Sequence, residues 1–351
     1  MAKTWLITGA SRGFGRQLAE AVLDAGDQLV ATARQPEQLD DLVAAHGERV
    51  QAVALDVTDA AAAEAAVKTA VEAFGGLDVV VNNAGYANSA PIEEMTEDDF
   101  RAQVETNLFG VVNVTRAALP VLRQQRSGTF VQFSSIGGRV GGTPGMGAYQ
   151  TAKFAVEGFS EVLANEVAPF SVRVIIVEPG AFRTDWQGSS MELHPVGPDY
   201  EQTVGALNRY RSENNGNQPG DPARAAKIII GVVGSDDPPR RLILGADALI
   251  SAQQAAEARA AETEKWAEVS RSADFPTARP TPSSVAKKTT NWSRANDNQD
   301  LADHRSIERT GTCASGVRSR TRRPSRHHRL VTRREHRTRI QVPRHRPRVA
   351  P

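Results

Sequence analysis

A tyrosine and a lysine stand four residues apart in the segment Tyr149-Gln150-Thr151-Ala152-Lys153. In a helix this spacing places both side chains on one face. A free phenol titrates at about pH 10, and a neighbouring ammonium group favours the phenolate and lowers that pKa. The pair could therefore perform general acid–base catalysis. Two unrelated surface residues can also take this spacing by chance.

A glycine-rich loop, Thr8–Gly15, follows the apolar run Thr4–Thr8 and precedes a segment with helical spacing. Glycine lets the backbone turn sharply and approach a pyrophosphate, and free N–H groups at a helix N-terminus bind phosphate. A structural turn is the alternative, but the strand before the loop and the helix after it are the context that a dinucleotide-binding loop requires. The expected cofactor contacts in the loop are Gly9, Ser11, Arg12, Gly13, Phe14 and Gly15.

The residue at the end of the second predicted strand indicates which dinucleotide binds. An NAD-binding loop is followed about 20 residues later by an acid for the ribose 2′-hydroxyl, whereas this chain has Ala33 and Arg34 there. An arginine fork suits a 2′-phosphate, and Arg12 offers a second cation. Either arginine alone could be a solvated surface residue. Together, and without the acid, they favour NADP(H) over NAD(H).

Alternating segments predict the scaffold. Short β-rich runs, several of them continuous in Val, Ile, Leu and Phe, alternate with longer segments of helical spacing. This order predicts right-handed crossovers and a parallel sheet buried on both faces. The expected strands are Thr4–Thr8, Gln28–Ala33, Val50–Leu55, Asp78–Val81, Gly128–Phe133, Val172–Val177 and Arg241–Leu244. The expected helices are Arg16–Ala25, Pro36–Ala45, Ala60–Phe74, Phe100–Gln124, Gly147–Val167 and Glu257–Val269. The fold class is α/β, a Rossmann-like doubly wound parallel sheet whose ligand crevice lies at the carboxyl ends of the strands.

The composition separates a body from a tail. Of the 351 residues, the stretch 304–351 holds 15 Lys and Arg against 2 Asp and Glu, which leaves 27 basic and 39 acidic residues in 1–303. We expect a single domain over 1–276 and a disordered basic C-terminal tail over 277–351, where no hydrophobic period continues. A nucleic-acid-binding arm is one interpretation of the tail, but its runs lack interleaved aromatic residues. An unselected, non-native extension is favoured.

The single cysteine, Cys313, lies in the tail. Disulfides, cysteine metal sites and cysteine nucleophiles are therefore not expected in the body. No signal peptide and no run of about 18 apolar residues is recognisable. A cytoplasmic location without a membrane partner is expected.

Taken in order, these motifs resemble the short-chain dehydrogenase/reductase family from residue 3 to about 275. Thr8–Gly15 matches its TGxxxGxG loop, and Tyr149 with Lys153 matches YxxxK. The other matching positions are Asp56-Val57, Asn82-Asn83-Ala84-Gly85, Asn107, Ser134-Ser135, and Pro179-Gly180 with Thr184 as PGxxxT.

The resemblance implies catalytic roles. Tyr149 would be the general acid in reduction and the general base in oxidation, and Lys153 would bind the nicotinamide ribose and lower the tyrosine pKa. Ser135 would hydrogen-bond the substrate oxygen. Asn107 would hold a water that links Lys153 to solvent, although an ordinary helix asparagine is its alternative. The family usually places its serine 13 residues before the tyrosine, but Ser135 is 14 before, so Ser134 stays an alternative.

The resemblance also implies the remaining cofactor contacts. Asp56 and Val57 would lie at the adenine, and the backbone of Asn83, Ala84 and Gly85 would lie against the adenosine ribose. Pro179, Gly180 and Thr184 would hold the carboxamide end.

A lid over about 185–217, together with 142–146, would line the substrate pocket. Its apolar and aromatic residues favour a moderately hydrophobic carbonyl or alcohol substrate, or they only pack the lid against the body. By analogy, Phe100–Gln124 and Gly147–Val167 would form the contact of a homo-oligomer, a dimer or tetramer.

The sequence therefore predicts an enzyme that transfers hydride between nicotinamide and a carbonyl or secondary alcohol. An NADP(H)-binding regulatory protein without turnover is the alternative.

Overall fold

The computed structural model describes residues 2–188 and 190–275. Their contacts define a compact unit, Met1–Ala273. The tail expected over 277–351 lies outside the described residues. Within the described part, no helix combines the length and the apolar character that a membrane crossing requires.

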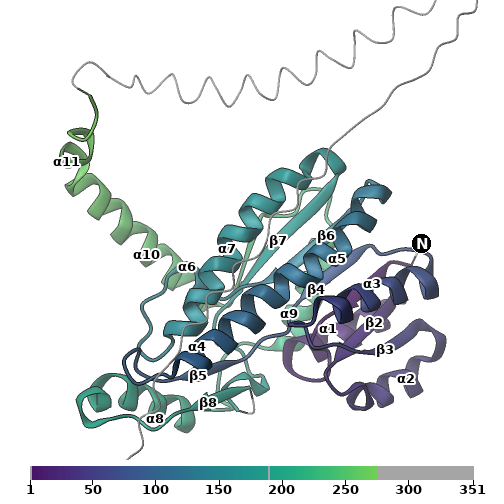
Figure 1. Cartoon of the computed structure of the whole chain (residues 1–351), viewed down its shortest axis with the longest axis horizontal. Helices are drawn as coiled ribbons and strands as arrows, with labels where there is room; N and C mark the ends of the chain where they lie inside the picture. The colour runs from purple at the N-terminus through teal and green to yellow at the C-terminus, as the bar shows by residue number, and fades with distance from the viewer. Residues whose placement is uncertain (1, 189, 276–351) are drawn as a thin grey trace, which may run out of the picture. The chain divides into compact units, whose positions relative to one another are not determined.

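Seven parallel strands form the central sheet in the order β3-β2-β1-β4-β6-β7-β9 (Figure 1). The order reverses direction beside β1, which is the switch point where open α/β sheets bind ligands. The strands are β1 (Thr4–Ile7), β2 (Gln28–Ala33), β3 (Val50–Ala54), β4 (Val79–Asn82), β6 (Gly128–Phe133), β7 (Val172–Pro179) and β9 (Arg241–Leu244). The predicted fold class is confirmed, and the seven predicted strands match within two residues at each end.

Helices cover both faces of the sheet because successive strand residues point to opposite sides. On one face, Leu18 and Val22 of α1 (Gly13–Asp24) and Ile229 of α9 (Pro222–Val233) pack against strand residues such as Ile7. On the other face, a second cluster joins α3 (Ala60–Phe74), α5 (Gly110–Gln125) and α7 (Gly147–Val167) to residues such as Leu6. Consecutive residues Leu6 and Ile7 thus belong to different cores.

The other helices are shorter or peripheral. They are α2 (Asp40–His46), α4 (Glu97–Val104), α6 (Ile136–Arg139), α8 (Ala206–Glu213), α10 (Ala246–Lys265) and α11 (Ala267–Arg271).

Several features differ from the prediction; helix α6 was not expected, and the expected helix 36–45 is a 3-10 turn, Pro36–Leu39, followed by α2. The expected helix 100–124 is α4 and α5 joined by a π-helical turn, Glu105–Phe109. The last long helix is α10, which begins eleven residues before the expected 257. Helix α9 was not predicted. The expected lid contains α8 and a three-residue strand, β8 (Met191–Leu193), that pairs in parallel with β5 (Ala87–Ser89).

Candidate active site

Two adjoining cavities lie at the carboxyl ends of the strands. The larger, of about 680 Å³, lies over the loop between β1 and α1 and the ends of β2 and β3. The smaller, of about 130 Å³, contains Tyr149 and Lys153. Trp186, Thr184 and Phe14 line both. A dinucleotide lying across the switch point would span both cavities.

The glycine-rich loop forms the floor of the larger cavity. Gly9 has φ +66°, a left-handed conformation that glycine adopts without strain, and a Cβ there would lie 3.1 Å from the backbone of Ala84. Asn83 ties the two loops together because its Nδ2 donates to the carbonyl oxygens of Thr8 and Gly9, at 2.9 and 3.1 Å. Helix α1 begins at Gly13 without a side-chain cap. Its first N–H groups are therefore available to an anion.

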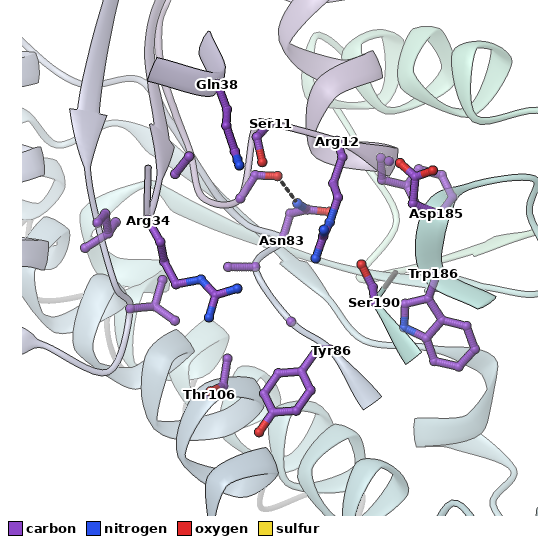
Figure 2. A pocket seen from close by; sticks show the side chains of 18 of the residues that line it. Ser11, Arg12, Arg34, Gln38, Asn83, Tyr86, Thr106, Asp185, Trp186 and Ser190 are labelled. Carbon is purple, nitrogen blue, oxygen red and sulfur yellow. Dashed lines mark hydrogen bonds between the residues drawn. The ribbon is translucent and has the colours of Figure 1, made fainter. Parts of the chain in front are cut away.

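Two arginines supply the positive charge of this cavity. Arg12 and Arg34 extend toward the same space from two sides (Figure 2). Both are exposed, and neither forms an ion pair with any described carboxylate. The Asp56 carboxylate is occupied locally, since it accepts hydrogen bonds from the backbone N–H and hydroxyl of Thr58 that lower its pKa. The cavity thus combines free N–H groups with unpaired cations, which suits a phosphorylated dinucleotide.

Tyr149 lies at the bottom of the smaller cavity. Its side chain contacts Ser135 through a hydrogen bond, but burial outweighs that bond and raises the pKa of Tyr149 to about 12. The phenol therefore keeps its proton at neutral pH. The Tyr149–Lys153 spacing predicted that Lys153 lowers this pKa. In the structure the effect of burial is larger, and the lysine Nζ lies 5.7 Å from the phenol ring centre.

Lys153 is equally buried, at 4% exposure. Its Nζ donates to the carbonyl oxygen of Phe133 at 2.8 Å, which fixes the ammonium beside the end of β6. Burial lowers the pKa of Lys153 to about 8, and the charge of Glu157 opposes this effect. A cation held here could bind ribose hydroxyls and stabilise a phenolate.

The π-helical turn brings Asn107 to the same place. Its Nδ2 donates to the carbonyl oxygens of Tyr86 and Gln103, both at 2.9 Å. Its Oδ1 is buried and has no hydrogen-bond partner among the described residues. A Cβ at Gly85 would lie 2.5 Å from this Oδ1 and 3.7 Å from Lys153 Nζ, so the bare glycine leaves a gap between the two groups. The gap fits the polar link to Lys153 that the resemblance implies.

The two candidate serines differ in position. Ser135 is the N-cap of α6, where its Oγ accepts from the N–H of Gly137 at 3.1 Å, and it also contacts Tyr149. Ser134 Oγ is buried and unpartnered, and it faces Gly138. The geometry favours Ser135 as the serine that acts with the tyrosine.

The turn after β7 closes the smaller cavity. Asp247 Oδ2 accepts from the N–H of Ala181 at 2.8 Å and so holds the backbone that follows Pro179 and Gly180. The Thr184 hydroxyl accepts from the N–H of Trp186 at 3.3 Å. The Trp186 ring lies 5.2 Å from the Tyr149 ring. The start of the lid therefore covers the phenol.

The structure brings nearly all of the predicted site residues together. The smaller cavity is lined by Asn107, Ser135, Tyr149, Lys153, Pro179 and Gly180, and the larger by Gly9, Ser11, Arg12, Gly13, Arg34, Asp56, Val57 and Ala84; Phe14, Asn83, Gly85 and Thr184 line both. Gly15 lines neither cavity, because it packs against the carbonyl of Gly9 and the side chain of Asn83.

Several lining residues carry no motif in the sequence and were not predicted. Phe133 and Phe182 both pack against Phe14, with ring centres 5.5 and 4.9 Å from its own, and the three rings line the smaller cavity. Phe182 lies between the fixed positions of the PGxxxT motif, which was the available signal. Tyr86 follows the Asn-Ala-Gly motif directly in the same way.

Comparison with known proteins identifies the family. The family model for short chain dehydrogenases matches residues 3–193. Oxidoreductase BOA17 of Botryotinia fuckeliana is 53% identical over 271 residues, which cover 77% of this chain and 98% of that protein. A 3-ketodihydrosphingosine reductase of Bacteroides thetaiotaomicron is 36% identical, over 68% of this chain and 87% of that protein.

Solved structures agree. A short-chain dehydrogenase from Streptomyces avermitilis superposes with a TM-score of 0.74 at 43% identity, over 78% of this chain and all of that one. A short chain dehydrogenase from Burkholderia cenocepacia in complex with NADP gives a TM-score of 0.59 at 27% identity, over 75% of this chain and 97% of that one. The chain is an oxidoreductase of the short-chain dehydrogenase/reductase family.

Proposed function

We propose that the chain is an NADP(H)-dependent oxidoreductase that transfers hydride between nicotinamide and a carbonyl or secondary alcohol. The observation that carries this proposal is the placement of the buried Tyr149 and Lys153 side chains in one cavity, with Lys153 Nζ 5.7 Å from the phenol ring centre and Ser135 at the phenol. When bound, the nicotinamide supplies the hydride.

Each residue then has a task in carbonyl reduction. Ser135 donates a hydrogen bond to the substrate oxygen and stabilises its developing charge. Tyr149 gives that oxygen its proton, and the Lys153 ammonium stabilises the phenolate that remains. Lys153 then gives a proton to the phenolate, and a water whose hydrogen bond Asn107 accepts passes a proton from solvent back to Lys153.

The choice of NADP(H) rests on Arg12 and Arg34, which both line the larger cavity and form no ion pair with a described carboxylate, although the charge of Arg34 reaches Asp56. The NADP named with the Burkholderia structure agrees with it. A ketone is the favoured substrate, since the Bacteroides relative is named as the reductase of a keto compound.

The first test is binding of NADPH and NADH to the purified protein. A charge-assisted hydrogen bond contributes about 1.5–3 kcal/mol, so Arg34→Ala is expected to weaken NADPH binding roughly 10- to 100-fold and leave NADH unchanged. Arg224→Ala, an exposed arginine of α9 outside both cavities, is the control. Equal loss of both nucleotides would contradict the assignment of Arg34 to the 2′-phosphate.

The second test is turnover of NADPH with a panel of ketones. Tyr149→Phe is expected to lower kcat by roughly 10²- to 10⁴-fold while NADPH still binds. Binding without turnover of any carbonyl or alcohol would instead favour the regulatory protein.

We also propose a homo-oligomer, a dimer or tetramer. Phe109 beside α5, and Phe154 and Val162 on α7, are 47%, 42% and 57% exposed and offer an apolar contact. A monomer in light scattering would contradict this. The cytoplasmic location stays a prediction.

A further inference from the structure

Buried charges link the helix that carries Tyr149 and Lys153 to two neighbouring strands. Glu178 near the end of β7 has no exposed side-chain surface, and it accepts hydrogen bonds from Arg139 at 3.2 Å and from Arg241 at 3.1 Å. Arg241 of β9 also pairs with Glu157 of α7, at 3.0 Å, and with Glu161 of the same helix. A single arginine thus joins β7, β9 and α7.

Glu157 stands four residues after Lys153 and therefore shares its face of α7. Both residues are almost completely buried, at 6% and 4% exposure. Arg241 holds the Oε2 of Glu157, while its Oε1 is buried and has no hydrogen-bond partner in the described chain. Burying a carboxylate with one oxygen unpaired costs folding free energy. Because it stands one helical turn from a buried ammonium, its charge can act on that group.

The other elements packed on α7 offer Lys153 no comparable carboxylate. Glu178 of β7 is paired with two arginines, Arg139 and Arg241, whereas Glu157 is paired with Arg241 alone. The segment β5 carries no charge. The charged residues of α4 and the π-helical turn are Glu97, Asp98, Asp99, Arg101 and Glu105. Glu97 forms an ion pair with Arg101, and Asp99 accepts a hydrogen bond from Thr96. Asp98 and Glu105 are exposed to solvent. Burial and Glu157 are accordingly what shifts the pKa of Lys153.

We propose that Glu157 is a positioning residue of the active site: anchored by Arg241, its carboxylate keeps the buried Lys153 in the ammonium form that turnover requires. The role of Lys153 in turnover rests on the proposed function, whereas the electrostatic link between the two side chains does not.

The test measures the titration of Lys153 directly. The chain has seven lysines, so ¹³C labelling at lysine Cε gives few signals, and Lys153→Met identifies the one of interest. In Glu157→Gln the midpoint of Lys153 is expected to fall by about one pH unit or more, because burial is then unopposed. Glu161→Gln is the matched control, since Glu161 pairs with the same Arg241 but is 37% exposed. It should shift the midpoint by less than about 0.3 unit.

A midpoint that is the same in the wild type and in Glu157→Gln would overturn the proposal, as would an equal shift in both variants. If Glu157→Gln does not fold, Glu157→Asp and Glu161→Asp repeat the comparison, and a shift confined to the first is expected. Because the titration needs no substrate, it gives a result even if no carbonyl is reduced. Once a substrate is known, the alkaline limb of the pH–rate profile should move with the midpoint.

Discussion

Replacing Gly138 with alanine tests how closely the serine must stand to the tyrosine. Helix α6 begins directly after Ser135, and its Gly138 faces Lys153 of α7. An alanine Cβ at Gly138 would lie 2.5 Å from Ser134 Oγ, 2.9 Å from Lys153 Cβ and 3.0 Å from the Lys153 carbonyl carbon. Ordinary contacts between such atoms are about 3.5–4.0 Å, so α6 must retreat by roughly 0.5–1 Å.

Ser135 moves with α6 because it is the N-cap of that helix. A misplacement of about 1 Å costs on the order of 100-fold in rate. Overpacking also costs about 1–3 kcal/mol of stability. We therefore expect Gly138→Ala to lower kcat by roughly 10- to 100-fold and to lower the urea midpoint of unfolding, while NADPH binding at the distant arginines persists.

Gly231→Ala is the matched control, because it introduces the same methyl group into α9, outside both cavities and the proposed oligomer contact, with nothing within 4 Å. There alanine should stabilise the helix by about 0.5–1 kcal/mol and leave kcat unchanged. The assays are steady-state NADPH oxidation with a carbonyl substrate and urea unfolding followed by circular dichroism. Full activity in Gly138→Ala would refute the reasoning that the α6–α7 contact sets the position of Ser135.

Three further outcomes are expected. Ser135→Ala should lower kcat by roughly 10²- to 10³-fold, whereas Ser134→Ala should cost less than about tenfold because its hydroxyl has no partner in the described chain; the reverse order in kcat would transfer the role to Ser134. Trp186→Ala should change KM more than kcat, because the ring covers Tyr149 without bonding to it, and an unchanged KM for a bulky ketone would count against a substrate contact. Carbonyl reduction should be maximal well below pH 8 and fall as the pH rises through about 8, where Lys153 loses its proton; a rate that stays level to pH 10 would contradict this dependence.

The sequence predicted the parts of the fold that repeat a strong pattern. The strands from Gln28, Gly128 and Arg241 begin and end as expected because each is a short apolar run between turn residues. The three-residue strands β5 and β8 escaped prediction, since three residues carry no measurable period. Helix α9 escaped because Ile228, Ile229 and Ile230 form a run of β-branched residues that looks like a strand, whereas the helix buries only one side of it.

The site was predictable where the residue type itself carries the chemistry. The grouping of Tyr149, Lys153 and the glycine loop in one candidate site followed from the order of all the motifs together, since each spacing alone also occurs by chance. The sequence could not predict that burial dominates the pKa of Tyr149, because this burial depends on how Trp186 and the turn after β7 fold over the phenol. Glu157 and Arg241 lie 84 positions apart in the sequence, so no local pattern predicts their contact.

The π-helical turn Glu105–Phe109 has a consequence for how this chain tolerates insertions and deletions. Each residue of a helix advances it by about 100°, so a turn with one extra residue sets the rotational phase between α4 and α5. Removing one residue there would rotate Val114, Ala118 and Leu122 of α5 out of the core while Gln103 of α4 stayed in place. Asn107 would leave the smaller cavity in the same step. An insertion or deletion in this turn would therefore disrupt the apolar core and the candidate site together.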